Sequence, residues 1–215
     1  MSVLIDITTF THEGLLILVR FLSAFKEKIG NLFFCYTGAE DYDPKQNDPQ
    51  LKWLTKGIKT IRSVLGFPGV HDPSKPNHLI ILFGFESDRT QRLIQNFEFE
   101  EVSLGFGAKN SSISNSHYEI NRSRHEELLK LYPFAKGFEF SLTDPVAAKS
   151  QIVEQIEKLP NHNTVVVPLN NKLSTIGAGL LAIENPRIPL CYVRAHEYNL
   201  NSYSTPSEKF FLFKL

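Results

Sequence analysis

The sequence contains little cysteine: two residues in 215, Cys35 and Cys191, each inside a short apolar run. Small secreted proteins held together by disulfides use many more, so a disulfide scaffold is excluded. Free cysteine behaves as a small hydrophobic residue, and we expect both thiols to be reduced and buried. The two cysteines are not spaced as metal ligands, and no two of the seven histidines have close metal-ligand spacing. We therefore predict no metal site.

The sequence also lacks net charge and long hydrophobic runs. Lysine plus arginine number 23, and aspartate plus glutamate also number 23. This balance argues against a nucleic-acid partner, because proteins that bind nucleic acids usually carry a basic excess. The longest apolar stretches, residues 14–19 and 78–85, are much shorter than the roughly 20 residues that cross a bilayer. The N-terminus has no basic segment of the kind that opens a secretory signal. We expect a cytoplasmic protein with no membrane partner.

What the sequence does have is a regular alternation of short apolar runs and helical patterns. Strands are predicted over residues 3–7, 32–36, 79–83, 101–106, 138–142, 164–167 and 188–193. Most of these runs are continuously apolar, which is typical of strands covered on both faces. The pattern predicts a Rossmann-like three-layer α/β sandwich, with a mostly parallel sheet of about six to seven strands and helices on both faces.

We expect a single domain over residues 1–215, because a chain of this length can bury one large core. Two segments fit the pattern less well. Residues 39–77 form a long insertion broken by prolines, in which residues 51–65 can form a helix, or a strand at the Ile61 end. A C-terminal tail begins at about residue 197. Its aromatic residues can add an edge strand or cover a protein partner; they are Phe210, Phe211 and Phe213.

Candidate binding residues follow the predicted strands. In open α/β sheets, ligands lie outside the carboxyl ends of the strands, and a helix N-terminus favours an anion there. Thr8 and Thr9 follow the first strand, and Arg89 lies in the first turn of a predicted helix, where a cation is unfavourable unless it meets an anion. Lysine and hydroxyl side chains open the helix near residue 174. The candidate ligand-binding residues are Thr8, Thr9, Arg89, Lys172, Ser174 and Thr175.

Each of these residues also has a simpler interpretation. The threonines can be ordinary helix caps. Arg89 can form an ion pair with Glu86, and Asp88 can do so with Arg92. Small residues at positions 177–179 can serve close helix packing alone. The sequence leaves these alternatives open.

Candidates for catalysis are fewer. The sequence has no GxSxG nucleophile elbow, no Walker motif and no HExxH zinc motif. A carboxylate in or after a strand can act as a general base or a nucleophile, and Asp6 and Glu86 occupy such positions. His196 or Tyr42 could assist. No cofactor is predicted.

At the level of fold, this layout resembles Rossmann-like nucleotide-sensing domains, such as the sensor domains associated with CRISPR systems. The surplus of hydroxyl, amide and cationic side chains at the predicted strand ends favours nucleotide binding at the carboxyl edge of the sheet. Our leading hypothesis is a domain that binds a nucleotide or another phosphorylated small molecule, as a sensor or recruitment subunit of a larger assembly, with a protein partner or as a homo-oligomer. The alternatives are a nucleotide-directed transferase or glycosidic hydrolase, and a structural interaction subunit that uses its aromatic tail.

Overall fold

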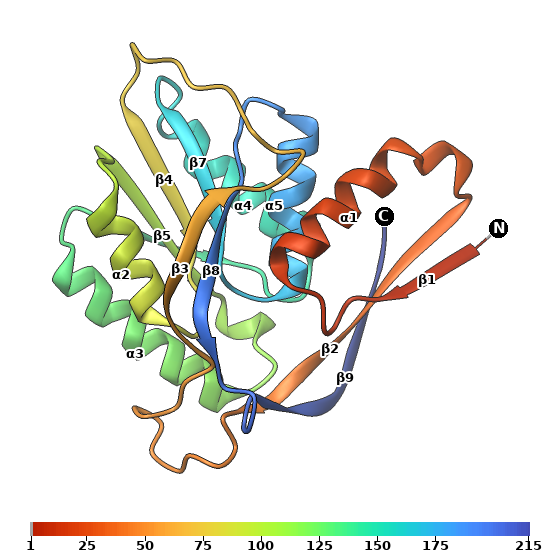
Figure 1. The fold of residues 1–215 in the computed structure, drawn as a ribbon, viewed down its shortest axis with the longest axis vertical. Coiled ribbons are helices and arrows are strands. Elements are labelled where there is room, and N and C mark those ends of the chain that lie inside the picture. The colour runs from red at the N-terminus through yellow and green to blue at the C-terminus, as the bar shows by residue number, and fades with distance from the viewer. Residues whose placement is uncertain (1) are drawn as a thin grey trace.

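The computed structural model describes residues 2–215. Its centre is a parallel sheet of four strands in the order β6-β5-β4-β7 (Figure 1). In β4 the apolar residues Leu79 and Leu82, with the two isoleucines between them, are buried. Burial on both faces is expected for a central strand of a parallel sheet. The strands are β4 (Asn77–Leu82), β5 (Glu101–Gly107), β6 (Lys136–Phe140) and β7 (Asn163–Pro168).

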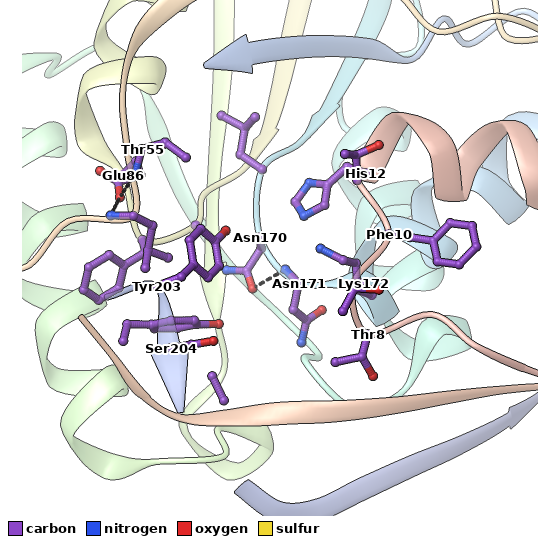
Figure 2. A pocket seen from close by; sticks show the side chains of 18 of the residues that line it. Thr8, Phe10, His12, Thr55, Glu86, Asn170, Asn171, Lys172, Tyr203 and Ser204 are labelled. Atoms are coloured by element: carbon purple, nitrogen blue, oxygen red, sulfur yellow. Dashed lines mark hydrogen bonds between the residues drawn. The ribbon is translucent and has the colours of Figure 1, made fainter. Parts of the chain in front are cut away.

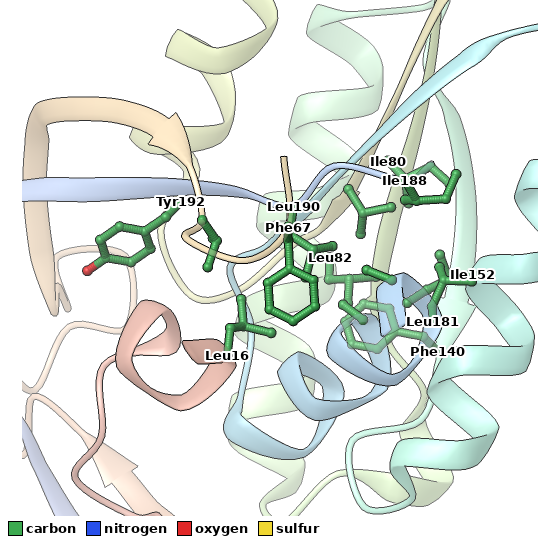
Figure 3. Packing of buried hydrophobic residues seen from close by; sticks show 14 of the residues in the cluster. Leu16, Phe67, Ile80, Leu82, Phe140, Ile152, Leu181, Ile188, Leu190 and Tyr192 are labelled. Carbon is green, nitrogen blue, oxygen red and sulfur yellow. The ribbon is translucent and has the colours of Figure 1, made fainter. Parts of the chain in front are cut away.

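Helices cover both faces of this sheet (Figure 1). Leu79 and Ile81 of β4 join an apolar cluster with α2 and α3. Ile80 and Leu82, which point the other way, join a second cluster with α4 and α5 (Figure 3). The alternating direction of side chains along a strand divides the core in this way. The helices are α2 (Ser87–Asn96), α3 (Asn115–Leu131), α4 (Pro145–Glu157) and α5 (Lys172–Glu184).

Helix α5 approaches two other helices closely through small residues. A Cβ atom added at Gly177 would lie 2.7 Å from the backbone carbonyl oxygen of Pro145, in α4. A Cβ atom at Gly179 would lie 3.0 Å from a terminal methyl group of Leu16, in α1. The small residues near the start of α5 therefore serve helix packing.

A second sheet, in the order β1-β2-β9, carries α1 on one face (Figure 1). Strand β1 is parallel to β2, and β9 is antiparallel to it. Leu15 and Val19 of α1 pack with Phe34 of β2 in a separate apolar cluster. The elements are β1 (Ser2–Asp6), α1 (His12–Ala24), β2 (Asn31–Tyr42) and β9 (Ser204–Lys214).

A third, antiparallel sheet consists of β3 (Thr55–Ser63) and β8 (Cys191–Tyr198). Leu190, just before β8, forms an isolated parallel bridge with Val166 of β7, and Val193 of β8 packs in the apolar cluster of Leu79 and Ile81. Two short 3₁₀ helices cover Lys26–Lys28 and Lys109–Ser111.

The predicted sheet is therefore wrong. The chain forms a four-stranded parallel sheet and two small sheets, one mixed and one antiparallel, rather than one mostly parallel Rossmann-like sheet of six to seven strands. The reason lies in the strand edges. Both edges of β2 are occupied, by β1 and β9, so β2 cannot join the central sheet. Strand β8 pairs with β3, and the bridge to β7 comes from Leu190, just before β8 begins.

The two irregular segments of the sequence supply the extra strands. Within residues 51–65, the strand alternative is confirmed by β3 and the helix alternative is wrong. The tail forms β9, an edge strand of the second sheet. Phe211 and Phe213 pack against the apolar cluster under α1, whereas Phe210 is 70% exposed. Within residues 2–215, no helix combines the length and apolar character that a membrane crossing requires.

Candidate functional site

A cavity of about 550 Å³ lies where the three sheets meet. Its walls come from the turns that follow β1, β4 and β7, from β2, and from the segment that connects β8 to β9. Helices α1, α2 and α5 begin at these turns, so three helix N-termini converge on the cavity. Free N–H groups and the helix dipole make such termini favourable to anions. Figure 2 shows His12, Lys172 and Thr8 on one side of this space, with Glu86, Thr55 and Tyr203 opposite.

The turn between β1 and α1 forms the first wall. Thr11 is the N-cap of α1, and its hydroxyl accepts a hydrogen bond from the N–H of Gly14 at 3.1 Å. The Thr8 hydroxyl accepts one from the N–H of Thr37 in β2, at 3.0 Å. His12 donates through Nδ1 to the carbonyl of Pro168, at 2.9 Å. Burial, followed by the charge of Lys172, lowers the pKa of His12 well below its usual value, so its imidazole is neutral at pH 7.

The turn between β7 and α5 places a lysine in the cavity. Asn171 is the N-cap of α5 and accepts a hydrogen bond from the N–H of Ser174, at 2.9 Å. Asn170 donates to the carbonyl of Phe83, which fixes the turn against the end of β4. Lys172 follows, and Figure 2 shows its side chain beside His12. Burial, with a further contribution from the charge of Arg89, lowers the pKa of Lys172 to about 8.

Arg89 brings a second cation to the cavity from the first turn of α2. Its Nε is buried and has no hydrogen-bond partner within residues 2–215. One terminal nitrogen makes a long hydrogen bond, 3.4 Å, to the carbonyl of Val193. The nearby Asp88 is paired with Arg92 instead, at 2.9 Å. In the described part of the chain, no carboxylate forms an ion pair with Arg89 or Lys172.

Glu86 is the buried carboxylate of the cavity. Its Oε1 accepts hydrogen bonds from the backbone N–H groups of Leu54 and Thr55, the latter at 3.0 Å. Burial raises the pKa of the Glu86 carboxyl, although these two hydrogen bonds oppose the change. Glu86 therefore holds the start of β3 against the end of β4, rather than pairing with Arg89.

Aromatic and amide side chains complete the lining. Tyr203, between β8 and β9, and Tyr198, the last residue of β8, line the cavity and are 43% and 38% exposed, so they lie at its mouth. Asn121 of α3 lines it as well. No pattern in the sequence marks Tyr203 or Asn121 as site residues, because their positions depend on how the tail and α3 pack.

The structure brings most of the predicted site residues together. The cavity is lined by Thr8, Thr9, Tyr42, Glu86, Arg89 and Lys172. Four other candidates lie elsewhere. The hydroxyls of Ser174 and Thr175 donate to the backbone carbonyl of Asn171, and both residues are buried in α5.

Asp6 and His196 are exposed and lie outside the lining. The carboxylate of Asp6 accepts a hydrogen bond from the N–H of Thr8 at 2.9 Å, and hydrogen bonds from Thr8 lower the pKa of Asp6. Within residues 2–215, no group of three or more histidine, cysteine or acidic side chains is placed to hold a metal ion.

Comparison with known proteins finds distant similarity in structure and none in sequence. No protein-family model and no curated protein sequence matches the chain. Among solved structures, the chain is similar to Can2 from Sulfobacillus thermosulfidooxidans in complex with cyclic tetra-adenylate, with a TM-score of 0.44 and 13% sequence identity. The similar region covers 60% of this chain but only 36% of that one. Similarity at this level identifies neither a family nor a ligand for this chain.

Proposed function

We propose that the cavity binds a nucleotide or another phosphorylated small molecule, with its phosphate held between Lys172 and Arg89. One observation carries this proposal: two cations line the same cavity, and within residues 2–215 neither has an ion-pair partner. Removing a charge from water is costly, by several kcal/mol, unless an opposite charge compensates for it. An anionic ligand would supply that compensation.

The neighbouring groups suit a phosphate. Thr9 adds a hydroxyl to the cavity wall, and the N-terminus of α5 lies beside Lys172. Arginine presents a planar set of donors to phosphate oxygens, and lysine acts as a point charge. The tyrosines at the mouth of the cavity offer apolar surface and polar tips to the rest of the ligand.

A role in sensing or recruitment fits this cavity better than catalysis does. Of the two carboxylates considered for catalysis, Asp6 is exposed and turned to Thr8, and Glu86 holds the start of β3 through Oε1. Both are thus engaged in local structure. In this role, the protein would report the presence of its ligand to a partner or to a second copy of the chain.

The test is a thermal-shift screen of the purified protein. The ligands are inorganic phosphate, nucleotides, linear and cyclic oligonucleotides, NAD and sugar phosphates. A ligand present at about 100 times its Kd should stabilise the folded protein by about 2.7 kcal/mol. We expect Lys172→Ala to abolish this shift. We also expect Lys172→Ala to leave the ligand-free protein at least as stable, because the variant removes a partly buried cation that has no ion-pair partner within residues 2–215.

Lys130→Ala is the matched control, since Lys130 is exposed on α3 and does not line the cavity. This variant should keep the full ligand-induced shift. A folded wild-type protein that no phosphorylated ligand stabilises would contradict the proposal, as would an equal shift in Lys172→Ala.

The enzymatic alternative depends on Glu86, the buried carboxylate of the cavity. Glu86→Gln keeps an oxygen that can accept from Leu54 and Thr55, so the variant should fold. If the protein is a transferase or hydrolase, incubation with a bound nucleotide gives a new product by chromatography, and Glu86→Gln stops its formation. A binding protein returns the nucleotide unchanged in both forms.

A further inference from the structure

One face of α3 contacts the wall of the cavity at three successive positions. His117, Asn121 and Arg124 are spaced by four and three residues, so they share a face of the helix. His117 accepts a hydrogen bond through Nε2 from the N–H of Tyr42, at 3.2 Å, and its ring stacks on that of Tyr42. Arg124 donates to the carbonyl of Phe85 at 2.6 Å. Asn121 lies between them, and its buried Oδ1 has no partner within residues 2–215.

A second unpartnered group belongs to another residue that lines the cavity, Thr55. Thr55 is 4% exposed, and within the described residues its hydroxyl oxygen has no hydrogen-bond partner. The N–H of Thr55 donates to Oε1 of Glu86. The backbone hydrogen bonds from Leu54 and Thr55 both go to Oε1, and within residues 2–215 no group donates to Oε2 of Glu86. A hydroxyl and a carboxylate oxygen are thus both available beside β3.

Aromatic rings stand next to these polar groups. The rings of Tyr42 and Phe85 have centroids 5.2 Å apart, and both residues line the cavity. His117 stacks on Tyr42, and the guanidinium of Arg124 lies 4.3 Å from the centre of the Phe85 ring. Both rings are therefore held in place by α3. A fixed aromatic wall with polar groups beside it suits a planar heterocycle.

The polar groups favour a base that donates hydrogen bonds. The carboxylate of Glu86 can only accept hydrogen bonds, whereas the side-chain amide of Asn121 can both accept and donate them. An exocyclic amine can donate to these oxygens, and the ring nitrogen next to it can accept from the amide N–H, as in the bidentate pairing of asparagine with adenine. Buried polar groups left unpaired are costly, so a ligand that satisfies them gains affinity over one that does not.

We propose that the end of the cavity formed by Thr55, Glu86 and Asn121 is a subsite for a purine base that carries an exocyclic amino group. This inference rests on the proposed binding of a phosphorylated ligand, and it adds that Lys172 and Arg89 hold the phosphate while α3 and β3 select the base.

Two pairs of nucleotides test the subsite by calorimetry. AMP is compared with purine riboside 5′-monophosphate, which lacks the amine at position 6. GMP is compared with IMP, which lacks the amine at position 2. The two members of each pair carry the same phosphate, so only the amine differs. In at least one pair, we expect the amino nucleotide to bind about tenfold more tightly, which is the effect of one well-placed hydrogen bond.

Thr55→Val and Asn121→Ala remove the two unpartnered groups separately, and Asn115→Ala, at the exposed start of α3, is the control. We expect each of the first two variants to reduce the preference for the amino nucleotide, while the affinity for the member without the amine stays the same. The control should keep the full preference. Thermal melting confirms that each variant is folded.

The outcomes separate the two proposals. If both members of each pair bind equally, and Lys172→Ala abolishes their binding, the base subsite is overturned and the phosphate site stands. If a preference exists but survives both Thr55→Val and Asn121→Ala, the subsite is also overturned. If no nucleotide or other phosphorylated ligand binds the folded protein, the proposed function fails, and the subsite fails with it.

Discussion

Lys172, Arg89 and His12 form a small basic group in which two side chains are charged and one is neutral. His12 is held neutral at pH 7 because burial and the charge of Lys172 lower its pKa. Its Nδ1 proton is used by the carbonyl of Pro168, so Nε2 is the free nitrogen of the ring. The group therefore carries two positive charges at pH 7, from Lys172 and Arg89, and the charge on Lys172 is sensitive to mild alkali.

Ligand binding should therefore weaken as the pH rises through about 8, the pKa of Lys172. An anion binds the protonated lysine, so Kd should be constant below this pH and rise by up to about tenfold per pH unit above it. The second ionisation of a phosphate ester is complete above about pH 7, and adenine does not titrate in this range, so a ligand such as AMP keeps a constant charge. Calorimetry between about pH 7 and 9.5 measures the effect.

Lys172→Arg is the control, because an arginine stays charged throughout this range. The variant should bind with a Kd that does not change with pH. A wild-type Kd that is equally constant would show that the charge of Lys172 does not contribute to binding.

Part of the site can be predicted from residue types at strand ends. Thr8 and Lys172 each follow an apolar run, and the ends of β1 and β7 meet at the cavity although the two strands belong to different sheets. Ser174 and Thr175 have the same chemistry one turn further on, but helix geometry directs their hydroxyls to the carbonyl of Asn171. Asn121 belongs to a helix whose position no local pattern specifies.

At the scale of the elements, α5 depends on two glycines for different reasons. A side chain at Gly177 would meet the backbone of α4, which cannot move aside without moving the helix. A side chain at Gly179 would meet the end of Leu16, which can rotate. Alanine otherwise favours a helix over glycine by about 1 kcal/mol.

Gly177→Ala should therefore destabilise the protein, by about 1–3 kcal/mol, because the overpacking outweighs the gain in helix propensity. Gly179→Ala should change the free energy of unfolding by less, because Leu16 can adjust. Urea unfolding measures both values. Equal effects of the two substitutions would contradict the assignment of α4 as the rigid neighbour.

Elements with a strong local pattern could be predicted, and those formed by distant pairing could not. Strand β4 is a continuous apolar run and lies where the sequence places it, as does α4 with its Asp144 cap. Strand β3 carries the sequence TKGIKTIRS, in which apolar residues are too few to distinguish a strand from a helix. Its hydrogen bonds go to β8, far along the chain, and this partner decides its conformation.

At the scale of the whole molecule, the cavity joins segments that belong to different sheets. The turn after β1 forms one wall, and the segment between β8 and β9 forms part of the mouth. A bound ligand would contact both and connect them. Helix α4 contributes no residue to the lining.

Hydrogen exchange should reveal this connection. Once a phosphorylated ligand is bound, backbone amides of residues 8–12 and of residues 199–203 should both exchange more slowly, because local opening of either segment would break ligand contacts. Amides of α4 should be unchanged. Slower exchange in only one of the two segments would show that the ligand contacts one wall alone.

The pairing of distant strands also bears on how the chain folds. The registers Phe33–Lys214 in β2 and β9, and Thr55–Tyr198 in β3 and β8, bring together residues from opposite halves of the chain. Neighbouring β4 and β5, by contrast, are separated by one helix. Because loops must close before distant contacts form, pairings of this kind form slowly. We expect far-UV circular dichroism to recover first on refolding and ligand binding to recover later, so that a partly folded chain has most of its helices but cannot yet recognise its ligand.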